Sequence, residues 1–244
     1  MTSDTATYNL TALSERLFAE RRMLPLAGKI KRARELHSLA TDLVLALESL
    51  DALDALIAAQ SDGEDWKRVV TESALLNNAI ILYVRATKTA SDERGRCDLR
   101  SRFTQDEKLA HSELTDLRDG AIAHFGSGGT YSGEWQAELV VLQRNGEDMK
   151  PGVVTRRQML DRKLVGRVRR QVAVAYGLMR TLSLEKLEEI TVELNKVAAD
   201  DPNFHKELLQ HPLNMSVFLT SAEAAESALS QFAGGYASGI VRHG

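Results

Sequence analysis

The sequence IKRARELHSLATDLVLALESLDALDALI, residues 30–57, decides the fold class of this protein. Its apolar residues recur mostly at intervals of three and four, which is the spacing of a buried stripe along an amphipathic α-helix. The pattern lasts for roughly seven helical turns. It therefore predicts one long helix that spans a whole side of the fold.

The composition agrees with packed helices. Of the 244 residues, 43% are hydrophobic, which is enough for a proper core, but only 5% are aromatic. Leu and Ala dominate, whereas the strands of sandwiches and barrels favour β-branched and aromatic residues. We therefore predict a mostly α protein.

The charge and the termini restrict the classes of partner and compartment. The net charge of −3 argues against a surface that coats nucleic acid or anionic lipid throughout, so any such contact must be local. The single Cys97 cannot form an internal disulfide, which suits a reducing compartment. The N-terminus has no secretion-signal pattern, and no apolar run approaches the ~20 residues of a membrane-spanning helix. We expect a cytoplasmic protein with no membrane contact.

The N-terminal half is predicted to contain three more helices. The first covers residues 8–22, and another runs from a capping box at residues 61–64 to about residue 87. A further capping box, Thr104 with Glu107, opens a helix whose buried face consists of Leu109, Leu114 and Leu117. The Gly-rich and Ser-rich residues 126–133 then mark the main boundary of the chain.

The C-terminal half is predicted to begin with a small β-hairpin. Alternating apolar residues precede Asn145-Gly146, a dipeptide that suits a tight turn, and Val153-Val154 form the return strand. A helix follows from about Arg156, a second one begins at Ser183 as its cap, and a short one follows Asp201-Pro202. Residues 221–232 predict the last helix.

These elements suggest three regions. Residues 1–132 form a helical region, residues 133–232 carry the hairpin and the C-terminal helices, and residues 233–244 are a loose tail. The sequence leaves open whether the second region is a separate domain or packs on the same core.

The segment LRDGAIAHF, residues 117–125, combines residue types that suit phosphodiester chemistry. Arg118 carries a permanent charge on a planar fork that matches phosphate, and His124 can exchange a proton near neutral pH. On an unbroken helix the two side chains would lie about 120° apart around the axis and about 9 Å apart along it. Either Gly120 breaks the helix and reorients the histidine, or a second copy of the segment completes the site across a twofold axis. We favour the second arrangement.

This segment resembles the arginine-to-histidine motif of the HEPN superfamily, whose small helical domains occur in prokaryotic toxins, defence systems and uncharacterised bacterial proteins. Five residues separate Arg118 from His124, Asp119 is the polar neighbour of the arginine, and Leu117 and Ala123 match the apolar surroundings. The preceding helix, which ends in residues 81–85, is similar too. The resemblance covers residues 64–125 and implies a HEPN-like helical core, a homodimer and a motif near the dimer interface.

The resemblance implies a metal-independent endoribonuclease. Arg118 would hold the RNA phosphate, His124 would assist proton transfer, and Asp119 would orient one of them. Two alternatives remain open. The chain could be a non-catalytic helical module that binds a protein or nucleic-acid partner, or Arg118 and Asp119 could be solvated charges while His124 closes the helix C-terminus.

Other basic residues are candidate nucleic-acid contacts. On one helix, four of them would fall within about 60° of one another, beside a buried stripe: Arg156, Lys163, Arg167 and Arg170. Such a stripe could hold an RNA backbone, although a charged outer face explains the same pattern. Arg85 is a further candidate contact, with a surface charge as its alternative.

Metal and nucleotide chemistry have little support in the sequence. His205 and His211 are six residues apart with no accompanying cysteine or acid pattern, so they do not predict a zinc site. The glycines at 126, 128 and 129 lack the Lys and Ser or Thr of a phosphate-binding loop. We therefore expect no metal and no cofactor.

Overall fold

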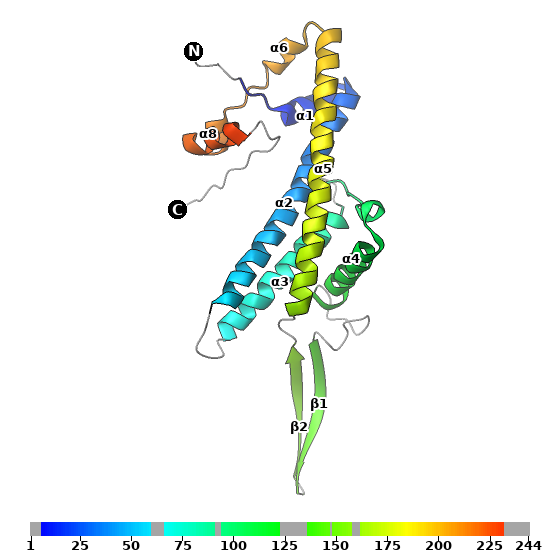
Figure 1. Ribbon diagram of the computed structural model, residues 1–244, viewed down its shortest axis with the longest axis vertical. Coiled ribbons are helices and arrows are strands. Elements are labelled where there is room, and N and C mark those ends of the chain that lie inside the picture. Colours follow the sequence, from blue (N-terminus) through cyan, green and yellow to red (C-terminus); the bar gives the residue numbers. More distant parts are fainter. Residues whose placement is uncertain are drawn as a thin grey trace. The chain divides into compact units, whose positions relative to one another are not determined.

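The computed structural model describes residues 6–59, 66–90, 94–122, 136–146, 148–157 and 162–231 (Figure 1). Within these ranges the protein is a mostly helical bundle with one small antiparallel hairpin, as the sequence predicts. None of the described helices combines the length and the apolar character needed to cross a membrane.

The chain forms two compact units. One consists of residues 1–37 with 181–244, and the other of residues 38–180. The two longest helices, α2 (Leu24–Ala58) and α5 (Arg162–Asp200), each contribute to both units. The predicted boundary between residues 132 and 133 falls inside the second unit, and the predicted tail lies outside the described residues.

The first unit is held together by an apolar cluster. Besides parts of α2 and α5, it contains α1 (Leu10–Glu20), α6 (Phe204–Leu208), α7 (Met215–Phe218) and α8 (Ala222–Gln231). Pro25 lies in the first turn of α2, where its missing N–H costs no helical hydrogen bond. The cluster contains these buried residues: Leu13, Leu17, Leu26, Ala27, Ile30, Ala33, Ile190 and Phe204.

The helix α5 corrects two predictions. The predicted break at Ser183 is wrong, because this residue is 1% exposed inside one continuous helix of 39 residues. Although Gly177 lies within α5, residues 178–183 contain no glycine or proline that would stop the helix, so its backbone ladder continues. The predicted start near Arg156 is also wrong, because Arg156 lies in a strand and α5 begins at Arg162.

The second unit is built around buried side chains of α2, α5, α3 (Trp66–Thr87) and α4 (Gln105–Leu117). Residues 80–84 are helical, as predicted. The capping box at the start of α4 is confirmed, since Thr104 Oγ1 accepts a hydrogen bond from Glu107 N at 3.3 Å and Glu107 Oε2 accepts one from Thr104 N at 2.8 Å. The predicted burial of Leu109 is wrong. This residue is 62% exposed, because it points about 140° around the helix from the buried Leu114.

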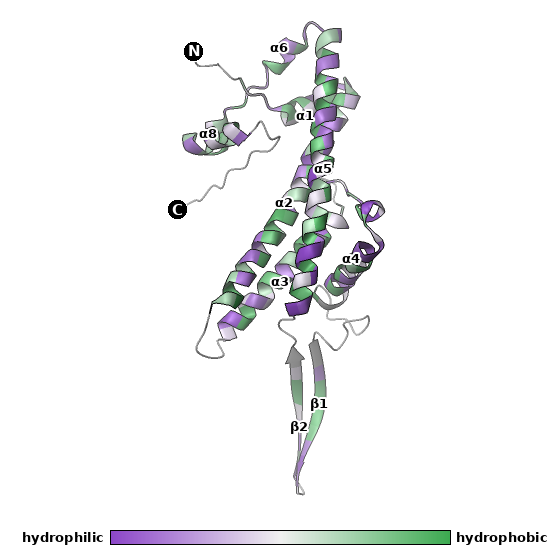
Figure 2. Ribbon diagram, in the orientation of Figure 1, coloured by the Kyte–Doolittle hydropathy of each residue, from purple (hydrophilic) through white to green (hydrophobic). Residues whose placement is uncertain are grey.

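The predicted hairpin is confirmed. Strand β1 (Gln136–Asn145) pairs antiparallel with β2 (Asp148–Arg157), and Asn145 lies opposite Asp148. Gly146 adopts a positive φ of 63°, which a tight hairpin turn requires and glycine tolerates without strain. Figure 2 shows that the middle of both strands is apolar, whereas the residues beside the turn are mostly polar.

Candidate functional site

The start of the predicted motif lies where α4 ends. Leu114 and Leu117 are 1% and 0% exposed, and they anchor the last turn of α4 in the second unit. The chain then continues as a wider π-helical segment, η2 (Arg118–Ile122), which contacts both α3 and α4. Because this segment is not α-helical, the angle calculated for one straight helix does not apply to the motif. His124 lies outside the described residues.

Two cations converge on the carboxylate of Asp119. Arg118 Nη1 donates to Asp119 Oδ1 at 2.8 Å, and Lys88 Nζ, directly after α3, donates to Asp119 Oδ2 at 2.7 Å. The side chains of Lys88, Asp119 and Arg118 are 46%, 38% and 36% exposed, so solvent and solutes reach all three. The hydrogen bond from Lys88, followed by that from Arg118, lowers the pKa of Asp119. The structure thus places Arg118 and Asp119 together and adds Lys88, which the sequence analysis missed.

A second polar group that the sequence analysis missed surrounds His111 of α4. Gln171 Nε2 donates to the hydroxyl of the fully buried Tyr83 at 3.0 Å, and this hydroxyl lies 2.8 Å from His111 Nδ1. Since the hydroxyl accepts from Gln171, it can donate its own proton to Nδ1, which assigns the imidazole proton to Nε2. One sequence feature could have identified His111: it precedes Arg118 by seven residues. Two turns of an α-helix bring residues with this spacing to the same side of the helix.

The surroundings of His111 disfavour its charged form. Burial lowers the pKa of His111, and the positive charge of Arg100 lowers it further, as do Lys88 and Arg96, against the opposing effect of Asp98. The imidazole is half-buried beside the ring of Phe103, with the ring centroids 5.6 Å apart. His111 is therefore a neutral hydrogen-bond acceptor in the folded protein at neutral pH.

This environment predicts a loss of stability in acid. In the unfolded chain the pKa of His111 returns to about 6.5, so below this pH the unfolded state binds a proton that the folded state binds less well. The contribution of the neutral imidazole is present above about pH 6.5 and is lost as the pH falls through the lower folded pKa. In urea unfolding between about pH 7 and 5, His111→Gln should therefore gain stability relative to wild type. His205→Gln, at an exposed position in α6, is the control, and a pH-independent difference for His111→Gln would contradict the assignment.

Arg85 takes part in a structural ion pair. Its Nε donates to Asp42 Oδ2 at 2.9 Å, and Asp42 also accepts from Arg94 Nη2 at 2.8 Å. Asp42 is only 5% exposed, whereas Arg85 is 48% exposed. The hydrogen bond to Asp42 raises the pKa of Arg85. Its role as a nucleic-acid contact stays a prediction.

The predicted basic stripe does not lie on a single helix. Lys163, Arg167 and Arg170 belong to α5, but Arg156 belongs to β2. Arg167 Nη2 donates to Glu113 Oε1 of α4 at 2.8 Å, which neutralises part of the stripe. Lys163 and Arg170 are exposed. The three α5 residues keep the predicted spacing, while Arg156 does not share it.

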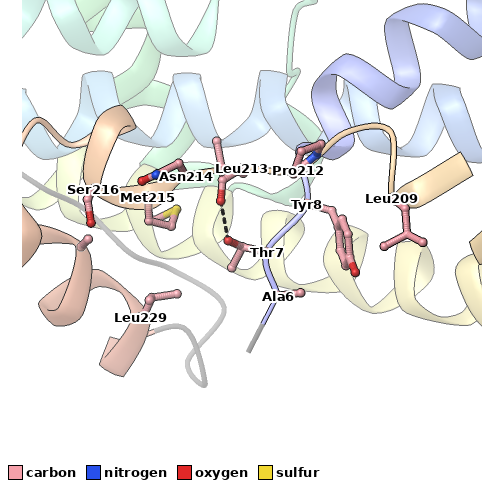
Figure 3. A pocket seen from close by; sticks show the side chains of 11 residues that line it. Ala6, Thr7, Tyr8, Leu209, Pro212, Leu213, Asn214, Met215, Ser216 and Leu229 are labelled. Carbon is pink, nitrogen blue, oxygen red and sulfur yellow. Dashed lines mark hydrogen bonds between the residues drawn. The ribbon is translucent and has the colours of Figure 1, made fainter. Parts of the chain in front are cut away.

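The first unit contains an open pocket of about 510 Å³ (Figure 3). Its lining comes from residues 6–8, Leu209, residues 212–216 and α8, and it is mostly apolar. The hydroxyl of Thr7 donates to the carbonyl of Leu213 at 2.7 Å, and Asn214 caps α7 by accepting from Val217 N. None of the lining residues is a histidine, a lysine, an arginine or an acid. Among the described lining residues, Tyr8 is the one whose type serves in general acid–base catalysis.

The described residues contain no group of three or more His, Cys, Asp and Glu side chains that could hold a metal ion. Comparison of the chain with protein-family models, curated proteins and solved structures found no match. The resemblance to the HEPN superfamily therefore stays a prediction from residues 64–125.

Proposed function

We propose that the protein is a HEPN-like, metal-independent endoribonuclease that acts on RNA phosphodiesters at the segment from Arg118 to His124. The convergence of Lys88 and Arg118 on the carboxylate of Asp119 carries the proposal. Two cations that already hold one oxyanion are suited to hold a phosphate beside it. The π-helical form of η2 adds support, because such segments are frequent at functional sites.

The cations have donors for a phosphate. Each of them donates one hydrogen bond to Asp119, whereas an ammonium group has three donors and a guanidinium group has five. The remaining donors can bind the non-bridging oxygens of the scissile phosphate. Asp119 holds the two cations in place. Together, Lys88, Arg118 and Asp119 keep a net positive charge, which attracts an anionic substrate.

The imidazole of His124 supplies the proton transfer. Cleavage without a metal requires the ribose 2′-hydroxyl to lose a proton as it attacks the phosphorus, and the leaving 5′-oxygen to gain one. A histidine that titrates near neutral pH serves either step, while Arg118 and Lys88 stabilise the charge that develops on the phosphate. This assignment requires neither a metal nor a cofactor.

RNA cleavage in the presence of chelator tests the proposal. The wild-type protein should cleave single-stranded RNA, and His124→Ala or Arg118→Ala should lower the rate by about 100-fold. The matched controls are His205→Ala and Arg34→Ala, which remove an exposed histidine and an exposed arginine from the first unit. Both should keep full activity.

Two results would remove the enzyme assignment. One is equal cleavage by the wild type and His124→Ala, which would indicate a contaminating nuclease. The other is cleavage by neither. If RNA binds without cleavage and Arg118→Ala weakens the binding, the alternative function, a non-catalytic nucleic-acid-binding module, replaces the enzyme.

A further inference from the structure

The hairpin exposes apolar side chains on both of its faces. Leu139 pairs with Val154 on one face, and these residues are 62% and 53% exposed. Val140 pairs with Val153 on the other face, and they are 82% and 70% exposed. An isolated two-stranded hairpin is marginally stable in water. Hairpins are usually stabilised by a third strand or by packing of one face against another element. The hairpin therefore has the composition of part of a larger sheet.

The two edges of the hairpin differ. In the described residues each strand pairs only with the other, so each has one outer edge. In β2, Pro151 has no N–H to offer, which makes that edge a poor template for another strand. Strand β1 contains no proline along its ten residues. The outer edge of β1 is thus the one suited to pairing.

The register of the hairpin identifies which groups of β1 point outward. Pro151 lies opposite Leu142, and a proline cannot donate within the ladder, so this is a pair whose backbone groups point away from the partner strand. The alternation of an antiparallel ladder then directs the N–H and C=O groups of every second residue outward. In β1 these residues are Glu138, Val140, Leu142 and Arg144.

We propose that β1 pairs antiparallel with β1 of a second copy of this chain, with the twofold axis at Val141. This pairing joins two hairpins into a four-stranded sheet and places Val140 opposite Leu142 of the second copy. It is an isologous contact, since the same strand serves both copies. The pairing does not depend on the ribonuclease activity.

Charge complementarity favours a second copy of this chain as the partner, and it favours this register. With the axis at Val141, Glu138 lies opposite Arg144 of the second copy, and the same pair occurs twice because of the symmetry. Moving the axis to Val140 would place Glu138 opposite Leu142 instead. Arg144 uses one of its five N–H donors on the carbonyl of Gly146, at 3.0 Å. The sequence of β1 is therefore self-complementary in charge about its own centre.

Disulfide trapping tests the register. Val141→Cys would place two cysteines directly opposite each other, with Cα atoms about 4.5–5.5 Å apart, which a disulfide spans. Leu139→Cys is the matched control on the same face, because its two copies would lie about 13 Å apart along the strands. The native Cys97 is buried. Under mild oxidation, Val141→Cys should give a covalent species of twice 27.0 kDa and Leu139→Cys should not. Mixing Leu139→Cys with Gln143→Cys should restore the crosslink.

Charge exchange tests the complementarity without a covalent bond. Glu138→Arg and Arg144→Glu should each weaken self-association at least about tenfold by sedimentation, because each creates like-charge pairs at both ends of the contact. A one-to-one mixture of the two variants should form heterodimers, and the double variant should form homodimers again. Equal crosslinking of Val141→Cys and Leu139→Cys, or a strictly monomeric wild type at high concentration, would overturn the proposal. A loss of RNA cleavage in His124→Ala leaves it untouched.

Discussion

Replacing Asp42 with alanine is expected to lower the free energy of unfolding by about 3 kcal/mol. The carboxylate is 5% exposed and holds both Arg85 and Arg94. Its removal leaves two guanidinium groups beside a partly desolvated site without their acceptor, and breaking such a pair costs more than the pair contributes. The expected loss lies at the lower end of the range for buried pairs, because Arg85 is 48% exposed and water screens part of its charge.

Urea unfolding measures this effect, and a surface pair provides the control. Glu15 pairs with Arg34 at 3.4 Å, and both side chains are 68% exposed. Glu15→Ala should change the free energy of unfolding by less than about 0.5 kcal/mol. Asp42→Asn should fall between the two, since it keeps an acceptor oxygen but loses the charge. A loss below about 1 kcal/mol for Asp42→Ala would mean that the two arginines find other partners.

Replacing Phe204 with alanine is expected to cost about 3–5 kcal/mol in the first unit. The ring is 1% exposed and belongs to the apolar cluster that includes Leu13, Leu17 and Ile190. Truncation removes most of the buried side chain and leaves a cavity, which the long helices cannot fill by a small shift. Because α6 has only five residues, it depends on this contact for its position.

Hydrogen exchange shows where in the protein Phe204→Ala lowers the stability. Phe204→Ala should raise the exchange rates of amides in α1 and α6, which belong to the first unit. Phe218→Ala is the matched control, because Phe218 is 67% exposed in the neighbouring α7. Equal destabilisation by the two substitutions would show that burial of the ring does not set the stability of this unit.

The local elements could be predicted from the sequence wherever one local signal was strong. The capping box at Thr104 and the Asn145-Gly146 turn both form as predicted, because each depends on residues within a few positions of one another. The break at Ser183 was wrong for the converse reason. A serine favours a helix start only where the chain also stops the previous helix, and residues 178–200 contain no glycine or proline.

The candidate site could be predicted only in part. Arg118 and Asp119 are neighbours in sequence, so their pairing is a local matter. Lys88 lies 31 residues before Asp119, and Tyr83 lies 28 residues before His111, so only the packing of α3 on α4 brings these groups together. Because these separations are long, no local pattern in the sequence predicts either pairing.

By itself, the sequence determined the helical class, the hairpin with its turn, and the adjacency of arginine and acid in the motif, because periodicity, capping and turn chemistry act over short distances. Only the tertiary structure decided that Lys88 joins this pair and that Arg85 is held by the buried Asp42. These outcomes depend on burial and on charges far apart in the chain. A side chain acquires such partners only when whole helices pack, and the energy of that packing is not encoded in any one segment.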